Sequence, residues 1–203
     1  MERYSEYKDS GIQWIGEIPS HWEARKIGYI FEERREKVSD IDFPALSVSK
    51  QGVTAQLETA VKTDNGDNRK KVCVGDFVVN SRSDRKGSCG ISPFTGSVSL
   101  INIVVKPRIE IIGLFFHYLF RCPNYVEEYY RIGRGIVADL WTTRYSEMRN
   151  ILVPFPPLSE QEHIVKFLEG KVLKIDEYIA DKEREIQLLK ELKEAEIAKA
   201  VTQ

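Results

Sequence analysis

The sequence changes character at a run of prolines near residue 155, and this change limits the folds open to the chain. Val153-Pro154-Phe155-Pro156-Pro157 contains three prolines, which stop a helix and favour an extended backbone. After this run the sequence has one glycine, Gly170, no proline, and many Glu, Lys, Ile and Leu residues. We therefore predict a globular domain over residues 1–157 and one long helical segment over residues 158–203.

The start of the helix has the signature of a capping box. Ser159 would be the N-cap residue, and Glu162 would be the acidic residue at the third helical position. No proline interrupts the sequence from Glu160 to about Ala200. The helix would then be roughly 60 Å long at 1.5 Å per residue.

Apolar residues in this helix follow a heptad pattern. Seven of the eight a and d positions between residues 165 and 189 are apolar, and Lys182 is the exception. The seven are Val165, Leu168, Val172, Ile175, Ile179, Ile186 and Leu189. A compact domain cannot bury a stripe of this length, so we predict a coiled coil with a second copy or another chain. The alternative is a helix folded back on its own domain.

The first 157 residues contain short strand and helix patterns without βαβ regularity. Residues 7–22 are rich in turn formers and hold Trp14 and Trp22, which predicts an irregular segment that the two indoles dock onto the core. Predicted strands are 45–49, 71–73, 77–81 and 98–105, and predicted helices are 113–120 and 125–132. This mixture predicts an α+β fold.

Charge is distributed unevenly along the chain. The formal net charge is −1, which excludes a globally basic nucleic-acid binder. Residues 62–157, however, carry 14 Lys and Arg against 9 Asp and Glu, a net of +5, whereas the segments on either side each carry −3. A polyanion would therefore bind to the middle segment.

Four stretches of this middle segment combine cations with small or aromatic neighbours, as loops that contact DNA do. They are residues 65–71, 80–88, 133–135 and 141–145, and their candidate DNA-contacting residues are Arg69, Lys70, Lys71, Arg82, Arg85, Lys86, Arg134, Trp141 and Arg144. Arg82 and Arg134 are the candidates for base edges, because Arg can bridge two guanine acceptors. Lys70, Lys71 and Lys86 suit phosphates. The alternative is that these cations only pair with acids such as Asp84, Glu127 and Asp139.

Signals for catalysis are absent from the sequence. It has no G-x-G-x-x-G, P-loop, nucleophile-elbow or kinase motif, and His21, His117 and His163 are scattered. His117 lies in an aromatic stretch, which favours packing. Cys73, Cys89 and Cys122 lack metal-ligand or disulfide spacing, so we expect no catalytic or metal site. With no secretion signal or membrane span, we expect a cytoplasmic protein.

Two parts of the chain resemble the specificity (S) subunits of type I restriction-modification systems. Residues 7–22, from Tyr7-Lys8-Asp9-Ser10-Gly11 to Pro19-Ser20-His21-Trp22, are similar to the start of those subunits. Residues 153–162 resemble the family's join between a target-recognition domain and its conserved helix, and Ile175-Asp176 and residues 189–202 continue the likeness. The middle of the chain matches only in coarse plan, as expected of a domain that varies with the DNA sequence it reads.

The resemblance implies a non-catalytic DNA-recognition subunit. It implies that the chain reads half of a bipartite site in double-stranded DNA and holds modification and restriction subunits, which would carry S-adenosylmethionine, ATP and Mg²⁺. Typical S subunits have two recognition domains and two antiparallel conserved helices, whereas this sequence has one of each, so we expect a homodimer or pairing with a second specificity half. The alternatives are a self-contained DNA-modifying enzyme and a coiled-coil adaptor that does not bind DNA.

Overall fold

The computed structural model describes residues 4–56, 66–135 and 141–202, and most of its strands are only three to six residues long. The strands are β1 (Tyr7–Ile12), β2 (Gly16–Pro19), β3 (Glu23–Lys26), β4 (Phe31–Glu33), β5 (Lys37–Val38), β6 (Leu46–Ser49), β7 (Gly52–Ala55), β8 (Arg69–Val72), β9 (Phe77–Asn80), β10 (Cys89–Ile91), β11 (Gly96–Val98), β12 (Asn102–Pro107) and β13 (Leu152–Phe155). The helices are α1 (Ile27–Ile30), the 3₁₀ turn η1 (Ser83–Arg85), α2 (Gly113–Leu119), α3 (Pro123–Arg131), α4 (Tyr145–Met148) and α5 (Leu158–Thr202).

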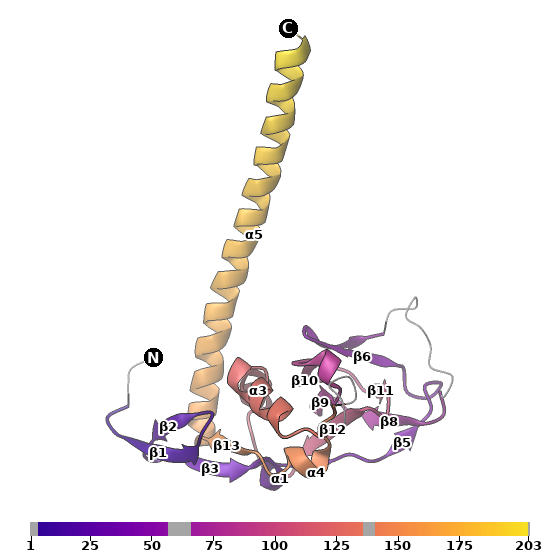
Figure 1. Ribbon diagram of the computed structural model, residues 1–203, viewed down its shortest axis with the longest axis vertical. Helices are drawn as coiled ribbons and strands as arrows, with labels where there is room; N and C mark the ends of the chain where they lie inside the picture. The colour runs from indigo at the N-terminus through magenta and orange to yellow at the C-terminus, as the bar shows by residue number, and fades with distance from the viewer. Residues whose placement is uncertain (1–3, 57–65, 136–140, 203) are drawn as a thin grey trace. The chain divides into compact units, whose positions relative to one another are not determined.

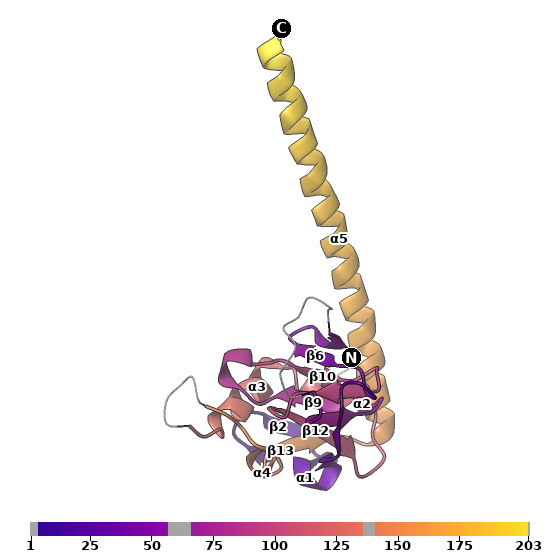
Figure 2. The same ribbon diagram turned by 90° about the vertical axis from the view of Figure 1, so that its right-hand side faces the viewer.

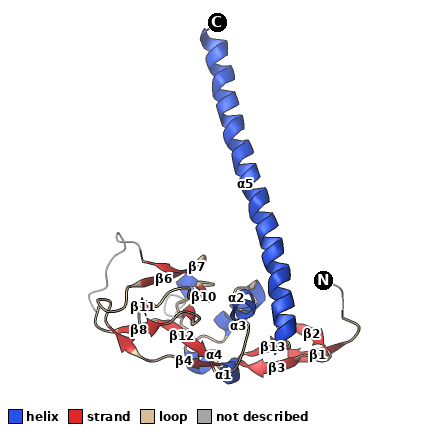
Figure 3. Ribbon diagram, turned by 180° about the vertical axis from the view of Figure 1, so that it is seen from behind, coloured by secondary structure: helices blue, strands red, loops and turns tan. Residues whose placement is uncertain are grey.

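The chain divides after Gln161 into two compact units. Strands dominate the first, and the second consists of the rest of α5 (Figure 1, Figure 3). The predicted α+β fold with one long C-terminal helix is confirmed. The predicted division between residues 157 and 158 stays a prediction.

Antiparallel pairing builds several small sheets in the first unit. The largest has the order β10-β9-β12-β4, and a second has the order β11-β8-β5. Three further pairs are β1 with β2, β6 with β7, and β3 with β13. The last pair brings residues 152–155, just before α5, onto residues 23–26 near the start of the chain.

Aromatic rings fill the core between the largest sheet and the helices. Phe120 lies at the centre, with its ring centroid 4.8 Å from that of Phe77 and 4.6 Å from that of Tyr125. Helix α3 accordingly lies beside β9 and β10 (Figure 1, Figure 2). A second cluster of buried aliphatic residues joins the two larger sheets and contains Leu46, Val53, Val72, Val78, Val98 and Val104. Because these side chains are removed from water, both sheets form stable platforms for the loops that connect their strands.

Most of the predicted elements are present, with boundaries shifted by one or two residues. Strands β6, β8 and β9 correspond to the predicted strands 45–49, 71–73 and 77–81, and α2 and α3 correspond to the predicted helices. Helix α3 begins at Pro123, since proline is well suited to the first helical position.

The prediction of one strand over residues 98–105 was wrong. The chain turns after Val98, with the Asn102 amide donating to the Ser99 carbonyl at 3.0 Å, and Leu100 and Ile101 are exposed in the turn. Strand β11 therefore belongs to one sheet and β12 to the other. Residues 98–105 are apolar except for Ser99 and Asn102, and this pattern concealed the change of sheet.

The predicted irregular course of residues 7–22 was also wrong. Strands β1 and β2 form a hairpin, and Gly11 and Gly16 have positive φ angles of 67° and 78° on either side of its turn. The predicted docking onto the core is confirmed for Trp14, whereas Trp22 contacts the first turn of α5. The Trp14 ring packs edge-on against Tyr125 at 5.8 Å, and the Trp22 indole donates to Glu160 at 2.9 Å.

The predicted N-cap was wrong by position. Helix α5 begins at Leu158, so Ser159 lies inside its first turn. The Pro157 carbonyl accepts the amides of Glu160 and Gln161 at 2.9 and 3.0 Å, which makes Pro157 the residue that opens the helix. A serine and a glutamate three residues apart can occur by chance, so this spacing does not fix the first residue of a helix. The prolines decided where α5 begins.

Candidate nucleic-acid interface

Three of the four predicted loops come together in space. The Thr142 amide donates to the Arg134 carbonyl at 2.9 Å, and the Arg134 amide donates back to the Thr142 carbonyl at 2.8 Å. The Thr143 amide donates to the Ser81 carbonyl at 3.1 Å. We call residues 81–88, 133–135 and 141–145 the loop cluster. It brings residues from both sides of α2 and α3 to one surface.

A close approach of backbone and rings holds the loop cluster. A Cβ atom at Gly133 would overlap the Trp141 indole and the Thr143 hydroxyl, so glycine is required there. The Trp141 Nε1 donates to the Tyr130 carbonyl at 2.9 Å, and the Thr143 hydroxyl donates to the Tyr129 carbonyl at 2.9 Å. Trp141 therefore anchors the loop on the end of α3, a structural role that the sequence did not predict.

The arginines of the loop cluster are exposed and loosely paired. Arg82 and Arg85 share Asp84, with Nε to carboxylate distances of 3.1 and 3.6 Å. The Arg134 side chain is 84% exposed, and its Nε lies 3.8 Å from Glu147. Arg144 is exposed and has no ion pair with any residue the structure describes. Ion pairs this exposed contribute little, so a stronger anion could replace them.

Lys86 is held more firmly than these arginines. Its Nζ lies 2.6 Å from Glu127 and 4.6 Å from the centre of the Tyr130 ring. The alternative interpretation was that these cations only pair with acids. Asp84 and Glu127 do form such ion pairs, and Asp139 lies outside the described residues.

The fourth predicted stretch behaves differently, because its cations lie on β8 and are engaged by the fold. Arg69 is buried, and its guanidinium donates to the Ser97 hydroxyl at 2.9 Å and to the Ser97 carbonyl at 3.2 Å. Burial lowers the pKa of this guanidinium from its ordinary value. A buried arginine cannot also reach a duplex, so the structure does not support the prediction that Arg69 contacts DNA.

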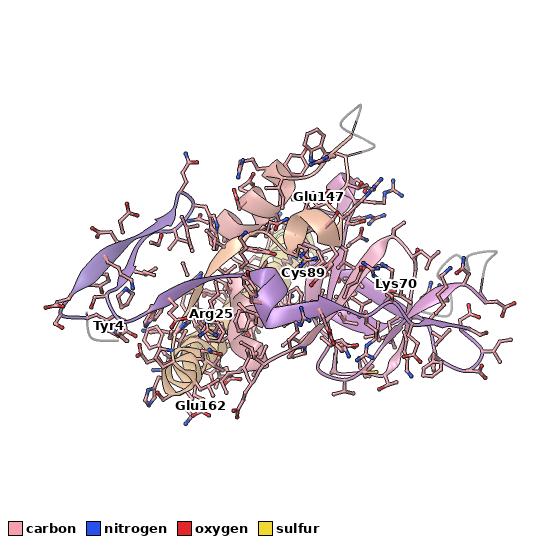
Figure 4. The ribbon with its side chains drawn as sticks, turned by 90° about the horizontal axis from the view of Figure 1, so that it is seen from below. Tyr4, Arg25, Lys70, Cys89, Glu147 and Glu162 are labelled. Atoms are coloured by element: carbon pink, nitrogen blue, oxygen red, sulfur yellow. The ribbon has the colours of Figure 1, made fainter. Side chains whose placement is uncertain are left out.

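The two β8 lysines also have partners. Lys70, labelled in Figure 4, donates to the Asn102 carbonyl at 2.8 Å and lies 3.4 Å from Glu33. Lys71 lies 2.8 Å from Glu36 and 4.8 Å from the centre of the Phe43 ring. Both side chains are mostly covered, with 17% and 23% exposed.

The first turn of α5 contains polar anchors that sequence reasoning missed. The Glu160 carboxylate accepts hydrogen bonds from Tyr4 at 2.7 Å and Trp22 at 2.9 Å, and lies 2.6 Å from the His21 ring. Burial acts to raise the pKa of Glu160, but these hydrogen bonds outweigh it and lower the pKa. Gln161 is fully buried, accepting the Ile112 amide at 3.0 Å and donating to the Pro156 carbonyl at 2.9 Å.

Burial shifts the pKa of two further titratable groups, Cys89 and His117. Burial raises the pKa of the Cys89 thiol to about 12, and its Sγ contacts the Phe120 carbonyl at 3.6 Å. His117 accepts the Ile91 amide at 3.3 Å, as packing predicts, and burial lowers its pKa. Within the described ranges, no three His, Cys, Asp or Glu side chains gather as a metal site would require. No helix in those ranges is long and apolar enough to cross a membrane.

The predicted seam of α5 is largely exposed in the single chain. Val172, Ile175, Ile179, Ile186 and Leu189 are between 41% and 57% exposed, whereas Val165 is buried and Leu168 is half-buried. Five apolar side chains on one stripe therefore contact water.

Comparison with known proteins identifies the fold. No family model matches the sequence, and no curated protein matches it significantly. Three solved structures are similar in fold: a chain from a study of complex assembly and conformational transition of the type I R-M system, the HsdS subunit from Thermoanaerobacter tengcongensis, and the type I restriction-modification S subunit from M. genitalium. The TM-scores are 0.56, 0.54 and 0.51, at 16%, 14% and 16% identity.

The matched region covers most of this chain but less than half the length of each of the three neighbours. The matches cover 85%, 84% and 74% of this chain, and 44%, 41% and 38% of the three neighbours. The chain therefore spans less than half the length of each of these three structures. The predicted resemblance to S subunits is confirmed at the level of the fold.

Proposed function

We propose that the chain is a DNA-recognition subunit of a type I restriction-modification system, carrying one target-recognition domain and one conserved helix. The observation that carries the proposal is the loop cluster, where Arg82, Arg134 and Arg144 from three separate loops share one exposed surface. The fold likeness to S subunits supports the same role. The predicted globular domain, residues 1–157, would read one half of a bipartite site.

Within this function the residues of the loop cluster have different tasks. Arg82 and Arg134 would contact base edges, because a guanidinium can donate two parallel hydrogen bonds to guanine. Arg85, Lys86 and Arg144 would contact phosphates and set the register of the domain on the duplex. Trp141 would act by holding its loop. The chain itself would have no catalytic activity, and S-adenosylmethionine, ATP and Mg²⁺ would bind to the modification and restriction subunits.

The experiment for this proposal is selection from a randomised duplex pool by the purified full chain, alone and with candidate modification subunits. We expect a short recurring sequence to be enriched. Methyl transfer by the chain alone would point instead to a self-contained enzyme, and a chain that enriches no sequence in either setting would contradict the proposal.

We also propose that α5 pairs with the helix of a second copy, in the antiparallel arrangement that the resemblance implies. Such pairing would cover the stripe that is exposed in the single chain and would restore two recognition domains. Replacing Ile179 and Ile186 with Asp should give monomers in analytical ultracentrifugation. Asp at Lys174 and Arg184, which lie outside the seam, is the matched control and should leave dimers. A wild-type chain that stays monomeric at high micromolar concentration would contradict this.

A further inference from the structure

A pocket of about 430 Å³ lies between α1 and α4, outside the loop cluster. It is lined by Lys26, Gly28, Tyr29, Ser146, Arg149 and Asn150. The two elements are joined directly by the Gly28 amide, which donates to the Arg149 carbonyl at 2.9 Å, and they lie next to each other in Figure 4. A Cβ atom at Gly28 would lie only 3.1 Å from the Arg149 Cβ, so glycine permits this approach.

The pocket is cationic, and its cations are unengaged. None of the six lining residues is acidic, and neither Lys26 nor Arg149 forms an ion pair with any acid in the described part of the chain. Burial raises the pKa of the Tyr145 phenol, and the charges of Arg149 and Arg108 oppose that rise while those of Glu33 and Glu32 add to it. Arg108 also donates to the Gly28 carbonyl at 3.2 Å. Arg108 also lies 3.7 Å from Glu32, so the positive charge at the pocket comes from Lys26 and Arg149.

The neutral lining residues suit a phosphodiester. The Ser146 hydroxyl donates to Glu147 at 2.9 Å, and the Asn150 amide donates to the Ser146 carbonyl at 2.8 Å. Asn150 keeps a second amide N–H for a phosphate, which together with Lys and Arg is a usual contact of DNA phosphates. Tyr29 is 71% exposed, an unusual position for a large aromatic ring that no described partner covers. Its ring could lie against a deoxyribose beside the bound phosphate.

Helix α4 connects this pocket to the loop cluster. Arg144 precedes α4, and Glu147 within α4 lies 3.8 Å from Arg134 of the loop cluster. The same Glu147 accepts the Ser146 hydroxyl at 2.9 Å, and Ser146 lines the pocket. We infer that the pocket between α1 and α4 binds a backbone phosphate of the same duplex that the loop cluster reads. This inference rests on the proposed function and extends its surface to residues 26–29, in a segment that is acidic overall.

The test compares DNA binding by the full chain and by the variant Lys26→Ala/Arg149→Ala. Fluorescence anisotropy is measured on the selected duplex and on a scrambled duplex between 50 and 200 mM salt. The slope of log K against log salt is negative, and each lost phosphate contact reduces its magnitude by about 0.9. For the two lost cations we expect a reduction of about 1.8. Affinity should fall about tenfold for both duplexes alike, because phosphate contacts carry no sequence information.

Two further variants make the result specific. Lys8→Ala/Lys190→Ala removes the same charge from exposed positions outside the pocket and should keep the wild-type slope. Ser146→Asp retains both cations but adds a negative charge to the pocket. It should therefore also lower the affinity for both duplexes. An unchanged slope in Lys26→Ala/Arg149→Ala, or a changed preference between duplexes, would overturn the inference while leaving the proposed function intact. A wild-type chain that binds no duplex would overturn both.

Discussion

Strand β8 and the loop cluster carry the same kinds of cation, but the fold uses them in opposite ways. On β8, Arg69 is buried against Ser97, and Lys71 is mostly covered by Glu36 and Phe43. In the loop cluster, Arg134 is 84% exposed and Arg144 is also exposed. Both regions belong to the one basic segment of the sequence, so charge count alone could not separate them.

The difference shows how the element that carries a residue decides whether its charge is free. A strand inside a sheet directs alternate side chains toward the protein interior, and a buried charge there must be paired or hydrogen-bonded. A loop held by its backbone leaves its side chains free for a ligand. The loop cluster meets this condition, since backbone hydrogen bonds and Trp141 hold it and its arginines are not needed for its shape.

The largest effect expected from this comparison is the loss of stability in Arg69→Ala. Removing the guanidinium eliminates the hydrogen bonds to Ser97 and leaves a cavity between β8 and β11, so the free energy of unfolding should fall by about 2–4 kcal/mol. Urea denaturation measures this. Arg35→Ala, which removes an 80% exposed guanidinium, should change stability by less than about 0.5 kcal/mol. A stable Arg69→Ala variant with weakened DNA binding would place β8 in the reading surface.

A smaller effect, on recognition instead of stability, is expected for Arg82→Ala and Arg134→Ala. Each should lower affinity for the selected duplex by about 1–3 kcal/mol and relax the choice of base at one position. Unfolding free energy should change by less than about 0.5 kcal/mol, because both side chains are exposed. Arg82→Lys is the sharper control, since it keeps the charge but cannot form the bidentate contact. Unchanged sequence preference in both Ala variants would show that another face reads the bases.

The smallest effect is expected for Lys71→Ala. Its ammonium is already engaged by Glu36 and Phe43, so it contributes at most one phosphate contact. The magnitude of the slope of log K against log salt should therefore fall by less than about 0.9. Affinity should decrease equally for all sequences in anisotropy measurements. A change in sequence preference would contradict the separation between β8 and the loop cluster.

Local patterns in the sequence were sufficient for the elements that are stabilised locally. The prolines at 154, 156 and 157 and the uninterrupted sequence after them predicted α5, and aromatic and apolar runs predicted α2, α3 and β9. The predictions failed where a distant partner decided the outcome. Strands β11 and β12 separate because each pairs in a different sheet. The β1–β2 hairpin is local, and there the turn-rich sequence of residues 7–22 concealed the strand pairing.

For the candidate interface, the sequence by itself determined which residues carry charge and which turns could approach a duplex. It placed Arg82, Arg134 and Arg144 among the candidates, but it equally placed Arg69 there and omitted Lys26 and Arg149. Only the tertiary structure decided which of these side chains are buried, which are paired and which share a surface. The physical reason is that burial and ion pairing depend on contacts between residues far apart in the chain, such as Arg69 with Ser97 and Gly28 with Arg149, and no local pattern encodes them.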